Sequence, residues 1–154
     1  MTGFKKKKRK GKQHVISKKT IIDGILFQSK LEGTCYKKLK EAGIPSIYEG
    51  KKFILMNPFT TISDSWEFKY GKFKPKLKGS SIAQMAYTPD FTCPNMKWVI
   101  EVKGRANESF PLRWKLFKNH LRETKQSPVL FMPTKGGDID MTIAEILKLI
   151  KSSE

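Results

Sequence analysis

Two short apolar runs joined by a turn constrain the fold of this 154-residue chain more than any other feature. Residues 86–92 and 97–103 are typical of β-strands, and the CPNMK segment between them is rich in turn-forming residues. Side chains alternate between the two faces of a strand. The even-numbered residues of the second strand should therefore form one apolar face, and the odd-numbered face should carry Glu101 and Lys103 beside Val99.

A tight turn at Asn95 and Met96 sets the pairing of the two strands. Residues whose numbers sum to 191 would then be opposite, which pairs Asp90 with Glu101. Opposed Cβ atoms in an antiparallel pair lie about 4.5–5.5 Å apart, and two carboxylates at this distance repel. Mg²⁺ would relieve the repulsion, because it is a hard cation that takes carboxylate oxygens as ligands. Lys103 alone could neutralise part of the charge, in which case the three groups form only a surface cluster of little energetic value.

The rest of the pattern predicts an α/β sandwich around a mixed sheet. A helix is expected within 27–42, with Ser29 and Glu32 as a capping box and Gly43 at its end. A helix at 111–124 and a strand at 129–132 would complete a βαβ crossover with the strand at 97–103. The other expected elements are a strand at 51–57, a half-exposed strand or hairpin arm at 65–73, a loop at 74–81 and a helix at 141–151 capped by Thr142 and Glu145.

Two later helices are expected to bury apolar stripes. The stripe of the helix at 111–124 comprises Leu112, Leu116, Phe117 and Leu121, and that of the helix at 141–151 comprises Ile143, Ile146, Leu147 and Ile150. Trp114 could stack on a base or pack into the core, and partial burial is favoured. The aromatic residues of the 65–73 arm could cover the sheet, form a dimer surface or stack on DNA, and we expect them to cover the sheet: Trp66, Phe68 and Tyr70.

The formal charge of +17 indicates a polyanionic partner. Nucleic acid is favoured over an anionic membrane surface, because no basic amphipathic helix with a clean apolar face is present. Residues 1–19 contain nine basic and no acidic residues and predict a disordered tail, either a solubilising or import-like segment or an arm that grips DNA. Residues 20–154 form the expected domain, which stays basic with 22 Lys and Arg against 14 Asp and Glu.

Several other classes of site lack their signatures. Cys35 and Cys93 are far apart and form no CxxC pair, so a zinc site with His14 and His120 is not expected. The chain has no GxSxG or GxxxxGK motif. It also has no apolar run of the roughly 20 residues that cross a bilayer, and its N-terminus lacks a signal-peptide core. We therefore expect a soluble cytoplasmic protein.

The spacing of the acidic residues resembles the PD-(D/E)XK nuclease superfamily. Pro89-Asp90 and Glu101-Val102-Lys103 match its signature, and Glu32 lies on the first helix, where many members carry a further acidic ligand. The expected order of elements over about 27–132 is similar to the α-β-β-β-α-β core of that superfamily, a restriction-endonuclease-like fold. Within it, the chain is most similar to small phage-type and Holliday-junction-resolving endonucleases, although the arm at 65–73 and the loop after it depart from a minimal core.

The resemblance implies a role for each matching residue. Asp90, Glu101 and Glu32 would be catalytic and would hold Mg²⁺, with Mn²⁺ as a substitute, and the Val102 carbonyl would add a ligand. Lys103 would orient or help to deprotonate the attacking water, which requires a lowered pKa. Basic residues beside this site and in the tail would contact DNA: Arg105, Arg113, Lys115, Lys5, Lys6, Lys7, Lys8, Arg9 and Lys10. For Arg105, Arg113 and Lys115 the alternative is a solvated helix face.

The function that follows from the resemblance is a Mg²⁺-dependent endodeoxyribonuclease that acts on branched or otherwise structured DNA. It implies a homodimer, because symmetric cutting of two strands needs two sites, and a bacterial or phage-infected cell. The alternative is a basic nucleic-acid-binding protein that keeps the nuclease fold without catalysis. The sequence leaves open whether the substrate is a junction, a mismatch, a duplex or RNA.

Overall fold

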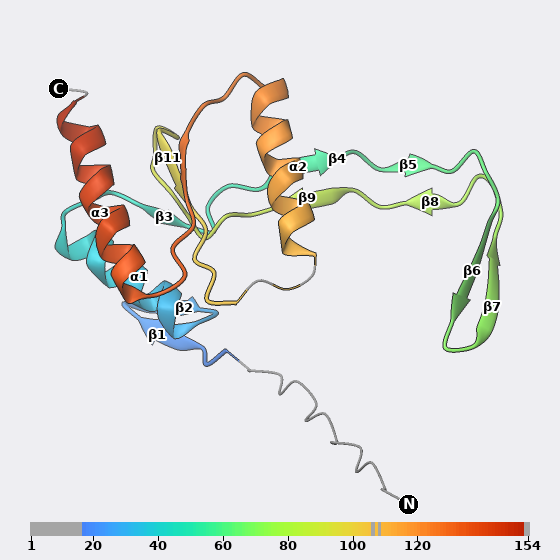
Figure 1. The fold of residues 1–154 in the computed structure, drawn as a ribbon, viewed down its shortest axis with the longest axis horizontal. Helices are drawn as coiled ribbons and strands as arrows, with labels where there is room; N and C mark the ends of the chain where they lie inside the picture. The colour runs from blue at the N-terminus through green and yellow to red at the C-terminus, as the bar shows by residue number, and fades with distance from the viewer. Residues whose placement is uncertain (1–16, 106, 108, 153–154) are drawn as a thin grey trace, which may run out of the picture.

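The computed structural model describes residues 17–105, 107 and 109–152 (Figure 1). Most of the predicted tail is outside these ranges, including the six tail residues expected to contact DNA: Lys5, Lys6, Lys7, Lys8, Arg9 and Lys10. Within the described residues, no helix has the length and apolar character needed to cross a membrane.

A mixed four-stranded sheet in the order β12-β11-β10-β3 forms the centre of the fold. Strand β10 (Phe91–Thr92) is antiparallel to β3 (Ile47–Tyr48) on one side and to β11 (Trp98–Ile100) on the other. Strand β12 (Val129–Phe131) is parallel to β11 and follows helix α2 (Phe110–Glu123). The α/β class, the mixed sheet and the βαβ crossover predicted from the sequence are therefore confirmed.

Helices cover both faces of this sheet (Figure 1). Helices α1 (Lys30–Glu41) and α3 (Gly136–Lys151) lie on one side, where residues of both pack with Trp98, Ile100 and Val102. Helix α2 lies on the other side, where Phe117 and Leu121 pack with Val99. The even and odd positions of β11 thus face different cores, as alternation along a strand predicts.

The cap of α1 follows the predicted chemistry. The backbone N–H of Glu32 donates to Oγ of Ser29 at 3.2 Å, which satisfies one of the free N–H groups at the helix start. Just after the helix, Gly43 has a φ of +66°, a left-handed conformation that costs glycine little. A short hairpin of β1 (Thr20–Ile22) and β2 (Ile25–Phe27) precedes this helix.

The start of α3 was predicted wrongly. The helix begins at Gly136 rather than at residue 141, and the hydroxyl of Thr142 donates to the carbonyl of Asp138 inside it. No side chain makes a capping hydrogen bond at the N-cap residue Lys135. Asp138 in the first turn instead accepts hydrogen bonds from N–H and Oγ1 of Thr134, which precedes the helix, at 2.9 and 2.7 Å. The buried face of the helix accordingly includes Ile139 with Ile146.

Three further apolar positions are more exposed than expected: Leu112 in α2, and Leu147 and Ile150 in α3. The predicted loop at 74–81 is also wrong, because it contains the end of β7 (Lys72–Lys76) and the start of β8 (Ser81–Ile82). The strand expected at 86–92 is divided into β9 (Met85–Tyr87) and β10 by residues 88–90.

Residues 47–92 form one long, interrupted antiparallel hairpin. Tyr48 pairs with Phe91, so the paired numbers sum to 139 between β3 and β10. The sum shifts to 140 and then 141 between β4 (Phe53–Met56) and β9, where the pairing is irregular. It stays at 141 between β5 (Phe59–Thr60) and β8, and between β6 (Ser65–Lys69) and β7. The outer part forms an arm that projects away from the helices (Figure 1), so the arm does not cover the sheet as expected.

Candidate active site

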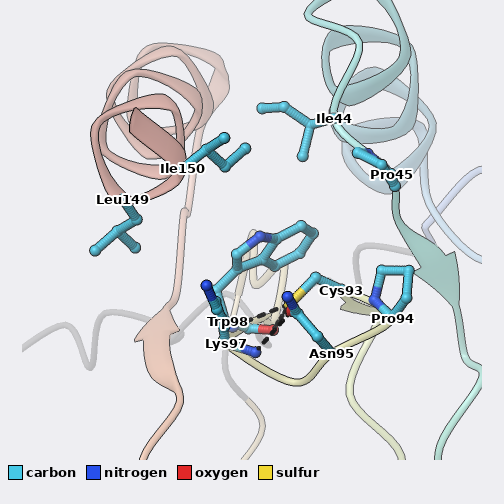
Figure 2. Close-up of a pocket in the computed structure, with 9 residues that line it drawn as sticks. All are labelled: Ile44, Pro45, Cys93, Pro94, Asn95, Lys97, Trp98, Leu149 and Ile150. Carbon is cyan, nitrogen blue, oxygen red and sulfur yellow. Dashed lines mark hydrogen bonds between the residues drawn. The ribbon is translucent and has the colours of Figure 1, made fainter. Parts of the chain in front are cut away.

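The turn between β10 and β11 sets the register of the candidate site. Phe91 pairs with Ile100 and Thr92 with Val99, so each pair sums to 191 as the sequence predicts. The turn is closed by the N–H of Met96, which donates to the carbonyl of Cys93 at 3.0 Å. Sγ of Cys93 lies 3.2 Å from the N–H of Trp98 and 3.0 Å from Oδ1 of Asn95 (Figure 2). These contacts hold the register that brings Asp90 toward Glu101.

Asp90 lies directly before β10 and is fixed by both neighbouring strands. Its carbonyl accepts a hydrogen bond from the N–H of Glu49 at 2.8 Å. Its Oδ2 accepts one from the N–H of Val102 at 2.6 Å, which bridges to the end of β11. Within the described part of the chain, Oδ1 has no hydrogen-bond donor, so this oxygen remains available to a ligand.

Glu101 lies directly after β11 and is 5% exposed. Its Oε2 accepts a hydrogen bond of 2.6 Å from the hydroxyl of Tyr87. Its Oε1 lies 3.3 Å from Nζ of Lys103, two residues further along the same strand direction. The two residues therefore share one surface, as predicted, and the ammonium and the phenol together set the orientation of the carboxylate.

Lys103 is placed by a second contact. Its Nζ lies 4.5 Å from the centroid of the Phe110 ring, at the N-terminus of α2. A cation over an aromatic face is attracted by the ring quadrupole, by about 0.5–1 kcal/mol or more where water is excluded. The ammonium is thus held between a carboxylate and a ring instead of extending into solvent.

A cavity of about 420 Å³ collects these groups. Asp90, Glu101 and Lys103 all line it, and Tyr87 and Phe110 contribute to its wall. The two carboxylates therefore open toward the same space, which is the condition that a shared cation requires. Further residues that line this cavity are Lys52, Ala86, Thr88, Asn107 and Arg113.

The electrostatics of the cavity favour a proton or a cation on Asp90. Burial raises the pKa of Asp90 to about 8, and the negative charges of Glu101 and Glu32 act in the same direction. The Val102 N–H and the charge of Lys103 lower this pKa but do not offset the increase. A buried carboxylate next to other negative charges is unfavourable when ionised, and a bound cation relieves that cost.

Glu32 is not brought into the same cavity. Its Oε2 accepts hydrogen bonds from the hydroxyl of Tyr48 at 2.7 Å and from the N–H of Gln28 at 3.1 Å, and its Oε1 accepts one from Ser29 at 2.7 Å. It lines a neighbouring cavity with Val102 and Lys103. Among the described residues, no group of three or more His, Cys, Asp or Glu is arranged to hold one ion. The structure thus joins Asp90 with Glu101 and gives Glu32 donors of its own.

The donor set still fits Mg²⁺, which commonly takes one or two carboxylates and fills its other positions with water and substrate phosphate. Asp90 and Glu101 supply two such carboxylates at one cavity. Val102 is buried between Glu101 and Lys103, and a role for its carbonyl stays a prediction.

The predicted DNA-binding cations divide into separate groups. Arg113 lines the cavity of the carboxylates, whereas Arg105 lines the neighbouring cavity with Glu32. Lys115 is exposed on α2 and lines neither of these cavities. Trp114 is half-buried against the core under α2, as favoured from the sequence.

The residues of this cavity that sequence reasoning missed include Tyr87, which donates to Glu101, and Lys52. Tyr87 lies on β9, which pairs with β4 and is not part of the β10–β11 pair. Alternation along β10 and β11 therefore gives no sign that Tyr87 reaches Glu101. Lys52 directly precedes Phe53, which pairs with Tyr87, and this pairing places it beside the cavity. Only the pairing of β4 with β9, in which Phe53 lies opposite a residue 34 positions further along the chain, reveals both.

A second cavity, of about 360 Å³, lies at the other end of β10 and β11 (Figure 2). It is bordered by Cys93 and Trp98 at the turn, by Ile44 after α1 and by Ile150 on α3. Among the described residues that line it, only Lys97 and Cys93 have ionisable side chains. Because it has no carboxylate, this cavity does not have the chemistry of the first.

Comparison with protein families gives one match. The model of a family described as "Protein of unknown function (DUF1064)" matches residues 12–133. The chain belongs to the DUF1064 family. The matched range includes Asp90, Glu101 and Lys103, together with the long hairpin and α2. Searches of curated proteins and of solved structures find no match.

Proposed function

We propose that this DUF1064 protein is a Mg²⁺-dependent endonuclease that hydrolyses phosphodiester bonds in DNA. The convergence of Asp90, Glu101 and Lys103 on one cavity is the observation that carries the proposal. Two carboxylates and an ammonium at adjoining strand ends match the chemistry of the PD-(D/E)XK nucleases that the sequence resembles. The basic balance of the chain supports a nucleic acid as substrate.

Each residue of the cavity has a distinct task in this proposal. Asp90 and Glu101 would hold the ion, the first oriented by the Val102 N–H and the second by Tyr87. Bound Mg²⁺ supplies Lewis acidity and offsets the negative charge that builds up on the phosphate during displacement. Lys103 lies within hydrogen-bond distance of Glu101 and would orient the attacking water at the same cavity. Arg113 would face the substrate phosphate from α2.

The proposal extends to the structure of the DNA substrate and to the oligomeric state of the protein. Branched or structured DNA fits the small nucleases that the chain resembles, and symmetric cutting of two strands would need two copies of the single site.

Cleavage of plasmid and of labelled oligonucleotides tests the proposal directly. Linear, nicked, flap and four-way DNA, and RNA of matching sequence, should be incubated with Mg²⁺, with Mn²⁺ and with EDTA. We expect cutting of DNA that requires the metal and falls by at least about 100-fold in Asp90→Asn and in Lys103→Ala, the scale on which positioned acid–base groups contribute. Binding of DNA should persist in both variants.

Lys97→Ala is the matched control for Lys103→Ala, because Lys97 lies at the turn, at the far end of β11 from the carboxylates. It removes the same charge and should leave cleavage near the wild-type rate. If the wild-type protein binds DNA but no divalent ion promotes cutting of any of these substrates, the hydrolase proposal is wrong. The chain would then be a non-catalytic nucleic-acid-binding protein.

A further inference from the structure

The end of the long hairpin is a two-stranded ribbon, β6–β7, whose two faces differ in chemistry. Cross-strand partners lie on the same face of an antiparallel pair. Trp66 pairs with Pro75 and Phe68 pairs with Phe73, so one face is apolar and aromatic. The alternate pairs form the other face, which carries four lysines and one glutamate: Ser65 with Lys76, Glu67 with Lys74, and Lys69 with Lys72.

The aromatic face is packed within itself but open to solvent. The ring centroid of Phe73 lies 4.5 Å from that of Trp66 and 5.1 Å from that of Phe68, so the three rings form one continuous surface. Trp66 is 71% exposed, Phe68 is 74% exposed and Phe73 is 40% exposed. Exposed contiguous rings of this kind mark an interaction site, because isolated two-stranded ribbons gain little stability from displaying them.

The charge of the ribbon identifies the class of partner. Residues 65–76 contain four lysines and one acidic residue, a net charge of +3 in twelve residues. Glu67 is paired with Lys76 at 3.0 Å, so the one acidic group is already neutralised. A partner that fits both faces must offer flat apolar groups and negative charge together, and nucleic acid with unpaired bases has both. A second copy of this +17 chain matches the apolar face but not the lysines.

The spacing of the rings suits stacking. Trp66 and Phe68 are two positions apart on one strand, which corresponds to about 6.8 Å at a rise of about 3.4 Å per residue. Successive nucleotides in one strand of a DNA duplex rise by about 3.4 Å. A single strand stretched about twofold can therefore place successive bases against successive rings, whereas bases in an intact duplex are stacked on one another and unavailable.

We propose that the β6–β7 ribbon binds an unpaired stretch of nucleic acid, with bases on the aromatic face and the lysines of the other face reaching around the ribbon edges to phosphates. The ribbon is the outer end of the same hairpin whose inner strands border the carboxylate cavity. A substrate that contacts both would combine a single-stranded portion with the point of cleavage. This substrate preference depends on the proposed hydrolysis, but the binding itself does not.

Binding should be measured in EDTA, by fluorescence anisotropy, with labelled oligothymidylate and with a duplex of equal length. The Trp66→Ala/Phe68→Ala variant should bind the single strand at least about tenfold more weakly, since each stacked base contributes substantially to affinity. Its affinity for the duplex should change by a smaller factor. For the single strand, the Lys72→Ala/Lys74→Ala variant should lower the slope of log affinity against log salt by about 0.7 per lysine lost.

Two matched controls change other elements. Leu112→Ala removes an exposed apolar side chain from α2, and Lys148→Ala/Lys151→Ala removes two exposed lysines from α3. Melting temperatures of all variants should match the wild type, since the ribbon lies outside both cores. Light scattering should give the mass of each variant in solution. Unchanged single-strand affinity in Trp66→Ala/Phe68→Ala overturns the proposal. A loss of affinity that accompanies loss of a dimer also overturns it, and assigns the aromatic face to a second copy.

The metal-free design separates this proposal from the nuclease proposal. If no metal-dependent cutting is found but the ribbon variant loses single-strand affinity, the ribbon site stands and the nuclease proposal fails. If cutting occurs but the ribbon variant binds the single strand like the wild type, the nuclease proposal stands and the ribbon proposal fails.

Discussion

The hydroxyl of Tyr87 donates a 2.6 Å hydrogen bond to Oε2 of Glu101, and both side chains are buried. Burial raises the pKa of the Tyr87 phenol, and the adjacent Glu101 charge adds to this effect, so the phenol stays a proton donor. The contact joins β9 of the long hairpin to the end of β11 of the central sheet. The position of the Glu101 carboxylate, a proposed metal ligand, therefore depends on the position of the hairpin.

Tyr87→Phe should weaken divalent-metal binding and metal-dependent cleavage by about 10- to 100-fold, the usual cost of removing a group that orients a metal ligand. The variant keeps the ring that packs on Phe117 and loses only the hydroxyl. Calorimetric titration with Mn²⁺ and cleavage rates at saturating metal would measure the two effects.

Tyr36→Phe is a matched control for this change. Its hydroxyl donates a 3.0 Å hydrogen bond to Asp23 at an exposed position remote from the cavity lining. We expect metal affinity and cleavage of Tyr36→Phe to equal those of the wild type. Wild-type metal affinity in Tyr87→Phe would show that the phenol does not orient a ligand.

Asp90 should make the metal-free protein less stable as the pH rises. In the folded protein its pKa is about 8, whereas in the unfolded chain the carboxyl ionises near its ordinary value of 3.8. Folding therefore binds a proton between these pH values, so the contribution to stability is lost as the pH rises through this window. Asp90→Asn cannot ionise and should raise the melting temperature at pH 8 in EDTA; even about 1 kcal/mol corresponds to about 2–4 °C for a chain of this size.

The advantage of Asp90→Asn should shrink at pH 5, and added Mg²⁺ should stabilise the wild type but not the variant. Asp138→Asn provides a control of opposite sign, because hydrogen bonds from Thr134 lower the pKa of Asp138. That carboxylate contributes stability above its ordinary pKa, so Asp138→Asn should lower the melting temperature at pH 8. A melting temperature of Asp90→Asn below that of the wild type at pH 8 would show that burial does not disfavour the Asp90 charge.

Local sequence determined much of the site. The turn at 93–97 and the alternation of β11 together predicted that Asp90 would lie across from Glu101, and that Lys103 would share its surface. The capping residue Ser29 predicted the start of α1 in the same way. These features depend on contacts between residues close in the chain, for which residue type and spacing are sufficient.

The features that sequence could not supply depend on distant pairing. The direction of the Glu32 carboxylate is set by Tyr48, sixteen residues further on. The partner of Glu101 comes from β9, whose register follows the irregular hairpin and not the 191 pairing. The prediction that the aromatic arm covers the sheet is wrong, because alternation shows which residues share a face but not what that face contacts.

Glu32 should act mainly as a structural acceptor, in contrast to the ligand role that the sequence predicts for it. Its carboxylate receives hydrogen bonds from Tyr48, Gln28 and Ser29, and a glutamine cannot accept all three in the same way. Glu32→Gln should therefore lower the free energy of unfolding by about 1 kcal/mol, at the low end of the cost of leaving a donor unpaired, because these hydrogen bonds are only part-buried. Its metal affinity, measured by titration with Mn²⁺, should fall far less than that of Asp90→Asn. Glu41→Gln, at the exposed end of α1, is the control and should change neither quantity. A Glu32→Gln variant that keeps wild-type stability but no longer binds metal would restore Glu32 to the ligand set.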